Sequence, residues 1–408
     1  MKAGWEFKKI NEVCEIKPSK KEAKELLSDT DLVSFVPMKT LGINQKYFIA
    51  NETKELSEVS GSYTYFKNND VLLAKITPCF ENGKLGIASG LCNSIGFGSS
   101  EFVVYRPSDI VIPEYLYYFL NQQSFRDTGK TLMTGAVGHK RIPKDFYEEF
   151  SVPIPPLKEQ KQIVAILDDA FAAIEQAQAN IEKNIDNAKE LFQSKLNDIF
   201  SQKGDDWTEK TLDEIAIDFG RGKSKHRPRN DKKLFGGKYP FVQTGDIRNT
   251  SKILKNYSQT YNEIGLAQSK LWPKGTICIT IAANIAESAI LDFESCFPDS
   301  IIGLVVDKGK ATNDYTYYAL QFLKSKLKDL GKGSAQDNIN LGTFQKQYFP
   351  FPNIEKQREI ANILEDIEKI GIKLEHKYQQ KLTNLEDLKK SLLEQAFAGE
   401  LTNKDMPA

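Results

Sequence analysis

VPIPPLKEQKQIVAILDD, residues 152–169, and FPFPNIEKQREIANILED, residues 349–366, are two copies of one motif within a chain of 408 residues. They align without a gap in a register of 197 residues. A second matched pair opens each half of the chain, WEFKKINEV from Trp5 and WTEKTLDEI from Trp207. The chain therefore consists of two copies of one structural unit. The positions that are identical in the longer motif are Pro153/Pro350, Pro155/Pro352, Gln160/Gln357, Ile163/Ile360, Ile166/Ile363, Leu167/Leu364 and Asp169/Asp366.

After each copy of this motif the sequence takes on a helical pattern. Apolar residues recur every three or four positions over about 43 residues, which is typical of a coiled-coil helix. Each helix should be about 65 Å long at a rise of 1.5 Å per residue. Prolines before each run mark the helix entry, because they favour extended backbone. The same register continues through the helices in the identical pairs Leu191/Leu388, Ser194/Ser391, Leu196/Leu393 and Phe200/Phe397.

The two helices are predicted to pair with each other, because each has a single apolar seam that must be covered. The first helix leads the chain away from the first half, and the second begins beside the second half. We therefore expect antiparallel packing. The predicted fold class is α+β, with two mixed α/β domains separated by a long antiparallel two-helix coiled coil and related by a pseudo-two-fold axis. The predicted segments are a globular domain at 1–156, a helix at 157–203, a second globular domain at 204–353 and a second helix at 354–408.

The two globular domains share a scaffold and differ in their interiors. Short β-rich runs predict strands at SFVPM, DVLLAKI and FVVYR in the first domain, and at YPFVQT, GTICITIA and GLVVD in the second. Helices are expected near Glu114 and Asp314, at equivalent places. Matched ends with different middles suggest two domains that recognise two different targets.

Composition narrows the class of protein. A hydrophobic content of 40% with 27% charged residues is ordinary for globular domains. The five cysteines form no C-x-x-C pair, and there are only three histidines, which argues against a disulfide framework or a metal site. Reduced cysteines, and the lack of an apolar signal or span, predict a cytoplasmic protein without a membrane segment.

The most basic segment is GRGKSKHRPRNDKK, residues 220–233. Glycine and proline make it a loop, and its positive charge suits a phosphate backbone. The alternative is an ordinary solvated surface loop. Overall charge is balanced, with 55 basic and 55 acidic residues, which counts against nucleic-acid binding unless the basic residues are clustered. The candidate phosphate contacts are Arg221, Lys223, Lys225 and Arg227 in this loop, with weaker counterparts at Lys17, Lys20, Lys21, Lys140 and Arg141 in the first domain.

Two polar turns in the second half carry candidate base-reading residues. YPFVQTGDIRN, residues 239–249, contains Gln243, Asp246 and Arg248, and SAQDNIN contains Asn338 and Asn340. Glutamine, asparagine and arginine can pair bidentately with base edges. A capped turn with ordinary polar residues explains the first stretch equally well. GRGKS resembles the end of a Walker A loop, but Ile217 stands where the first glycine is required. No catalytic motif is recognised anywhere in the chain, so we predict no catalytic residues.

Two globular units, each ending in P-x-P-x-[LI]-x-x-Q-x-x-I before a long helix, resemble the specificity subunit of Type I restriction–modification systems. YPFVQTGDI and SAQDNINLGTFQKQYFPFP also resemble that family. The resemblance covers essentially the whole chain. FVPMKTLG, near Met38, departs from the Q-T-G-D pattern in the first domain. The resemblance implies a non-catalytic subunit whose two target recognition domains each read one half of a bipartite double-stranded DNA sequence, with the helices as a ruler between them.

The resemblance also implies the partners and the cofactors. Two methyltransferase subunits would dock on this chain, and restriction subunits with translocase and nuclease activity would complete the complex. S-adenosylmethionine, ATP and Mg²⁺ would be bound by those partners and not by this chain. The predicted docking sites are the outer faces of the helices near residues 158–166 and 355–363, represented by Gln160, Ile163, Gln357 and Ile360. The competing interpretations are a coiled-coil scaffold that spaces two protein-binding domains, and a self-contained enzyme with an unrecognised site.

Overall fold

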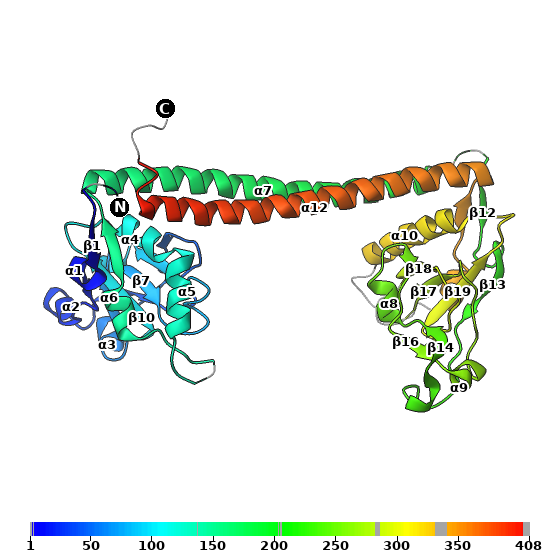
Figure 1. Cartoon of the computed structure of the whole chain (residues 1–408), viewed down its shortest axis with the longest axis horizontal. Coiled ribbons are helices and arrows are strands. Elements are labelled where there is room, and N and C mark those ends of the chain that lie inside the picture. Colours follow the sequence, from blue (N-terminus) through cyan, green and yellow to red (C-terminus); the bar gives the residue numbers. More distant parts are fainter. Residues whose placement is uncertain are drawn as a thin grey trace. The chain divides into compact units, whose positions relative to one another are not determined.

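The structure is a computed structural model that describes residues 2, 4–136, 138–202, 204, 206–281, 286–330 and 341–402. The chain divides into two compact units (Figure 1). The first unit comprises Met1–Ile181 and Gln379–Ala408, and the second comprises Glu182–Tyr378. Each unit holds one globular domain together with a part of each of the two long helices.

The globular domain of the first unit is built on a mixed five-stranded sheet of order β2-β10-β7-β8-β4. Its central strands are apolar and buried on both faces, which explains their runs of valine, leucine and phenylalanine. Helix α4, Pro113–Leu120, is buried from Tyr115 to Leu120 and belongs to the same hydrophobic core. The strands are β2 (Cys14–Ile16), β4 (Tyr47–Phe48), β7 (Val71–Ala74), β8 (Leu85–Ala88) and β10 (Phe102–Pro107).

A second sheet, of order β5-β3-β9-β6, extends this domain. It has its own small core, formed by residues such as Val33, Tyr65 and Phe97. A separate ribbon pairs β1 with β11 and ties the start of the chain to the strand that precedes the first long helix. The strands are β1 (Glu6–Lys9), β3 (Leu32–Val36), β5 (Glu52–Glu55), β6 (Thr64–Lys67), β9 (Ile95–Gly98) and β11 (Ser151–Ile154), and the helices are α1 (Ile10–Val13), α2 (Lys21–Leu26), α3 (Leu56–Val59), α5 (Gln123–Leu132) and α6 (Lys144–Glu149).

The second unit repeats the five-stranded sheet in the order β13-β19-β17-β18-β15. In both sheets the last strand pairs in parallel and the other neighbours pair antiparallel. A short ribbon of β14 and β16 stands where the first unit has its second sheet. The elements are β12 (Thr208–Lys210), β13 (Ala216–Arg221), β14 (Phe235–Phe241), α8 (Thr244–Arg248), β15 (Ile253–Leu254), β16 (Gln259–Tyr261), α9 (Glu263–Ala267), β17 (Ile277–Thr280), β18 (Ser288–Leu291), β19 (Ile301–Val306), α10 (Asn313–Leu330), α11 (Leu341–Gln345) and β20 (Phe349–Phe351).

The long helices are α7, Leu157–Ser201, and α12, Ile354–Ala398. They run antiparallel within each unit (Figure 1). Gln178 contacts Glu386 in the first unit, and Lys189 pairs with Glu375 at 3.0 Å in the second. The predictions of an α+β fold and of a long antiparallel helix pair are therefore confirmed.

Candidate nucleic-acid interface

The glutamine of the repeated motif joins each globular domain to its helix. Gln160 is fully buried, and its side-chain oxygen accepts a hydrogen bond from the backbone N–H of Ile112 at 3.0 Å. Its amide donates to the carbonyl oxygens of Ile110 at 2.8 Å and Pro155 at 2.9 Å. Ile112 is the N-cap of α4, so this one side chain satisfies backbone groups at the start of that helix and at the entry to α7.

Gln357 makes the same joint in the second unit. It accepts from the N–H of Thr312 at 2.9 Å and donates to the carbonyl oxygens of Lys310 at 3.3 Å and Pro352 at 2.9 Å. Tyrosines complete the joint, because Tyr115 donates to Pro153 at 2.8 Å and Tyr315 donates to Pro350. The repeated proline and glutamine thus maintain the angle between sheet and helix.

This geometry corrects one prediction. Gln160, Ile163, Gln357 and Ile360 lie inside the chain, with exposures of 0%, 0%, 0% and 4%. The choice of these four side chains as docking residues is therefore wrong, since a partner cannot reach them. The outer faces of the same helix turns stay a prediction for docking.

A lysine and a helix carboxylate form a second joint in each unit. Lys46 pairs with Asp168 at 2.6 Å, and Lys252 pairs with Glu365 at 2.9 Å and Asp314 at 2.6 Å. The hydrogen bond from Lys252 holds the pKa of Glu365 at about 2. Burial lowers the pKa of Lys252, but the hydrogen bonds to Asp314 and Glu365 and the charges of these carboxylates raise it. The net result is a pKa above the usual value for lysine.

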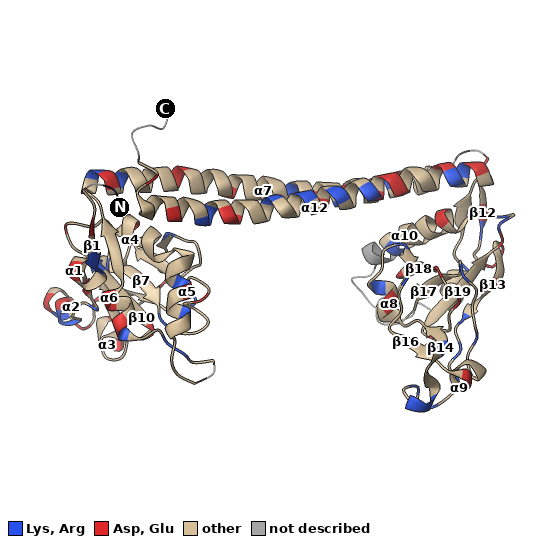
Figure 2. Ribbon diagram, viewed as in Figure 1, with Lys and Arg blue, Asp and Glu red and all other residues tan. Residues whose placement is uncertain are grey.

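The basic loop continues from the end of β13 and is rich in lysine and arginine (Figure 2). Arg221, Lys223, Lys225 and Arg227 are all exposed. The Arg227 guanidinium donates to the carbonyl oxygens of Ser224 at 2.6 Å and His226 at 2.8 Å, which holds the loop in one conformation. The loop is thus an exposed basic surface, while its use as a phosphate site stays a prediction.

Asp231 organises the far end of this loop. His226 lies 2.9 Å from its carboxylate, and this hydrogen bond is the main reason that the pKa of Asp231 is held at about 2. The backbone N–H of Lys233 also donates to it, at 3.1 Å. His226 therefore has a structural partner within the loop.

A cavity of about 510 Å³ opens beside the basic loop in the second unit. Predicted residue Gln243 lines it together with Arg229 and Lys232 of the predicted basic loop, whereas sequence reasoning missed Gln259. Gln259 could not be found from sequence, because it lies in NYSQTYN, a run of ordinary polar and aromatic residues with no recognisable motif. The lining includes Arg229, Asn230, Lys232, Phe241, Gln243 and Gln259.

The other predicted base-reading residues are placed differently. Asp246 caps α8, accepting from the N–H of Gln243 at 2.8 Å and the hydroxyl of Ser258 at 3.2 Å. The capped-turn explanation therefore accounts for this carboxylate. Arg248 is exposed and donates weakly to Asn249 at 3.4 Å. Asn338 and Asn340 lie outside the described residues.

The basic residues of the first unit are exposed in two places. Lys17, Lys20 and Lys21 surround the start of α2, and the Lys20 ammonium donates to the carbonyl of Gly61. Lys140 and Arg141 follow α5, where the guanidinium of Arg141 is paired with Glu101 at 2.7 Å. Arg141 would have to leave this partner, or share it, to bind a phosphate.

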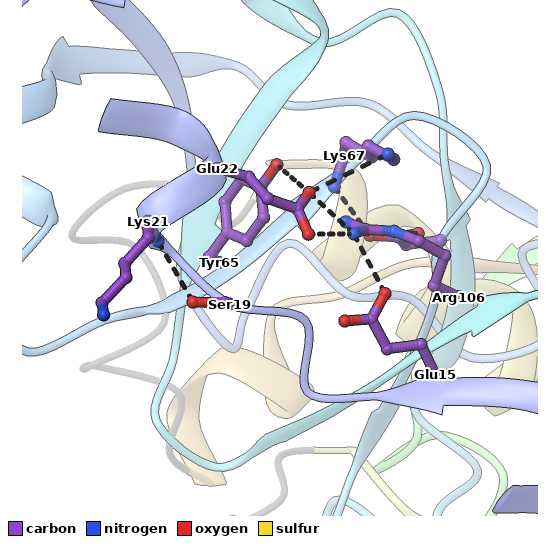
Figure 3. A network of polar contacts seen from close by, with 8 residues as sticks. Glu15, Ser19, Lys21, Glu22, Tyr65, Lys67 and Arg106 are labelled. Carbon is purple, nitrogen blue, oxygen red and sulfur yellow. Dashed lines mark hydrogen bonds and ion pairs between the residues drawn. The ribbon is translucent and has the colours of Figure 1, made fainter. Parts of the chain in front are cut away.

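Next to the first of these places lies a dense polar network (Figure 3). The Arg106 guanidinium donates to both oxygens of Asp70 at 3.0 Å, to Glu22 at 2.8 Å and to Glu15 at 3.4 Å. Tyr65 donates to Glu22 at 3.2 Å. Because these residues come from α2 and from both sheets, the network connects the two layers of the domain.

Two classes of site are not seen in the described ranges. No helix there combines the length and hydropathy needed for a membrane span. No cluster of three or more histidine, cysteine, aspartate or glutamate side chains there is suited to a metal ion.

Comparison with known proteins agrees with this arrangement. The family model described as "Type I restriction modification DNA specificity domain" matches twice, at residues 2–184 and 204–384. The EcoAI specificity subunit of Escherichia coli is 35% identical over 194 residues, which are 47% of this chain and 32% of that protein. The chain thus matches about a third of that relative's length. The putative MjaX specificity subunit of Methanocaldococcus jannaschii is 25% identical over 353 residues, 82% of this chain and 79% of that protein.

Solved structures show the same fold. A chain from a structure of a type I R-M system aligns with a TM-score of 0.79 over 98% of this chain and 99% of that one, at 17% identity. The HsdS subunit from Thermoanaerobacter tengcongensis aligns with a TM-score of 0.70 over 98% and 97%, also at 17% identity. Since the family model covers most of the sequence in two copies, this chain belongs to the Type I restriction modification DNA specificity family.

Proposed function

We propose that this chain is the DNA-specificity subunit of a Type I restriction–modification complex and that each globular domain reads one half of a bipartite duplex target. The observation that carries the proposal is the duplicated sheet, joined to its helix by the same buried glutamine in both units. Two scaffolds of one design with different loops suit two half-sites of different sequence. The exposed basic loop supports phosphate contacts by the second domain.

The chain itself would be non-catalytic. S-adenosylmethionine would be bound by methyltransferase subunits, and ATP and Mg²⁺ by restriction subunits. In this division of labour the present chain supplies sequence recognition and the docking surface, and its partners supply the chemistry.

Exposed apolar residues support docking of two equivalent partners. Ile166 and Ile363 are 38% and 40% exposed, and Leu191 and Leu388 are 59% and 45% exposed. Both pairs are identical in the repeat register, although core packing does not require it. Each unit holds one such isoleucine and one such leucine. We propose that each set contacts one methyltransferase subunit.

Replacing Ile166 and Leu388 by aspartate should remove one methyltransferase subunit and leave the other bound. Each substitution should weaken binding by about 2 kcal/mol, or about thirtyfold in Kd. The reason is that the apolar contact is lost and the aspartate would have to be desolvated at the interface. Native mass spectrometry of the complex gives the stoichiometry. The matched variant Ile363→Asp with Leu191→Asp should remove the other subunit. Ile217→Asp, an equally polar change at a residue that is 71% exposed outside these helices, serves as the control. Two bound subunits in both double variants would contradict the assignment.

The proposed function is tested by mapping methylated sites genome-wide, with and without the gene for this chain. The expected result is one bipartite motif that disappears with the gene. A scaffold for protein-binding domains would leave methylation unchanged and show no specific duplex binding. Methyl transfer by the isolated chain would instead establish an enzyme.

Helix length should set the gap in that motif. Removing residues 179–185 and 376–382 takes seven residues from each helix, about two turns, so that the helix faces are preserved. The gap should shorten by about three base pairs, because seven residues rise about 10 Å and one base pair spans about 3.4 Å. Methylation mapping of the shortened chain reads the new gap directly. An unchanged gap would contradict the proposal that helix length sets the distance between the two half-sites.

A further inference from the structure

The cavity beside the basic loop brings two glutamine side chains together. Strand β14 pairs antiparallel with β16, and Phe241 lies directly opposite Gln259. Residues opposite each other in such a pair project from the same face. Gln243 follows Phe241 by two positions, and its amide reaches the hydroxyl of Ser258 at 3.4 Å. Gln243 and Gln259 therefore line one cavity from adjacent strand ends.

Gln259 is one of several polar side chains that line this cavity. It is exposed, and its amide makes no hydrogen bond with any residue in the described ranges. Beneath it the ribbon is rigid, because Phe241 stacks on Tyr261 with ring centroids 4.0 Å apart and both rings are buried. An amide without a partner, carried on a rigid ribbon, is available for hydrogen bonds with an external partner.

The cavity is lined both by cationic side chains and by amide side chains. Arg229 and Lys232 line it from the basic loop, and the Arg229 guanidinium is still 50% exposed beside Asp299. Cations at such a rim suit phosphates, which position a duplex without reading it. An amide can pair bidentately with the N6 and N7 atoms of adenine, and this is the pairing that glutamine makes in the major groove.

We propose that Gln259, assisted by Gln243, reads an adenine in the half-site of the second domain. The inference rests on the proposed function and adds to it both the residue and the base. Gln259 is a specificity-determining residue in this assignment, while Arg229 and Lys232 contact the adjacent phosphates.

The test uses the full chain in its methyltransferase complex and duplexes that carry the motif found by methylation mapping. Gln259→Ala should weaken binding to the motif about 5- to 150-fold, the range expected for one bidentate base contact, and should relax preference at one adenine. Replacing that adenine by 7-deazaadenine, which lacks the N7 acceptor, should weaken the wild-type complex and leave the variant unaffected. Gln202→Ala, the same change at an exposed residue just after α7, should change neither the affinity for the motif nor the preference for adenine.

The outcomes separate this inference from the proposed function. If the wild-type complex shows no specific duplex binding, the proposed function fails. If it binds specifically and Gln259→Ala keeps full discrimination at every position, the inference alone is overturned. Relaxation at a position other than adenine would overturn the assignment of the base.

Discussion

Replacing Arg106 by methionine should destabilise the first globular domain by about 3–5 kcal/mol. The reason is Asp70, whose side chain is 1% exposed and whose two oxygens both accept from the Arg106 guanidinium. Removing one partner of a buried ion pair leaves an uncompensated charge in the interior, which costs far more than the intact pair contributes. Urea unfolding at pH 7 measures the loss.

The loss of stability in the Arg106→Met variant should become smaller as the pH falls. Burial raises the pKa of Asp70 above its usual value even though the hydrogen bond and charge of Arg106 lower it. A carboxyl group with a raised folded-state pKa contributes stability below its unfolded pKa and loses that contribution as pH rises through the folded value. Without Arg106 the folded pKa rises further, so protonation of Asp70 should recover stability between pH 7 and pH 4 in the variant.

Two controls isolate the buried charge. Asp70→Asn in the Arg106→Met background should restore part of the stability at pH 7, because a neutral amide is less costly to bury. Arg141→Met breaks the exposed pair with Glu101 and should change the stability little, because solvent screens such a pair. Parallel pH curves for wild type and Arg106→Met would contradict the proposed cause.

The sequence predicted the parts of the fold that repeat. The identical register of residues 152–169 and 349–366 located both long helices and their entry points, because a helix of this length has a strong periodic signal. The second sheet of the first domain was not predicted. Its strands β3 and β9 pair Ser34 with Gly96, and no local pattern indicates a pairing over such a separation.

The candidate site was predicted only where residue type alone is informative. A run of cations marks the basic loop in any fold, so residues 220–233 could be recognised directly. The identity of Gln160 and Gln357 is compatible with a buried joint or an exposed contact, and only their burial decides for the joint. Gln259 carries no signal of its own, because its importance depends on lying opposite Phe241.

Neutralising the basic loop should reduce DNA affinity strongly without changing the target. In the variant Arg221→Gln, Lys223→Gln, Lys225→Gln and Arg227→Gln, four exposed cations are lost. If each contacts one phosphate, the slope of log K against log salt should fall by about 3.6, and affinity at 0.1 M salt by between about three and four orders of magnitude. Titrations of a target duplex at several salt concentrations provide both values.

The matched control removes the same number of charges elsewhere, by replacing Lys373, Lys377, Lys381 and Lys390 on α12 with glutamine. Its slope should stay close to that of the wild type, because phosphate contacts and not net charge determine counterion release. A triple variant that retains Arg227 keeps the hydrogen bonds to Ser224 and His226 and should lower the slope by about 2.7. If these side chains contact phosphates and not base edges, methylation mapping should return the wild-type motif for each variant. A changed motif would assign the loop to base reading, and an unchanged slope would place the phosphate contacts on other residues.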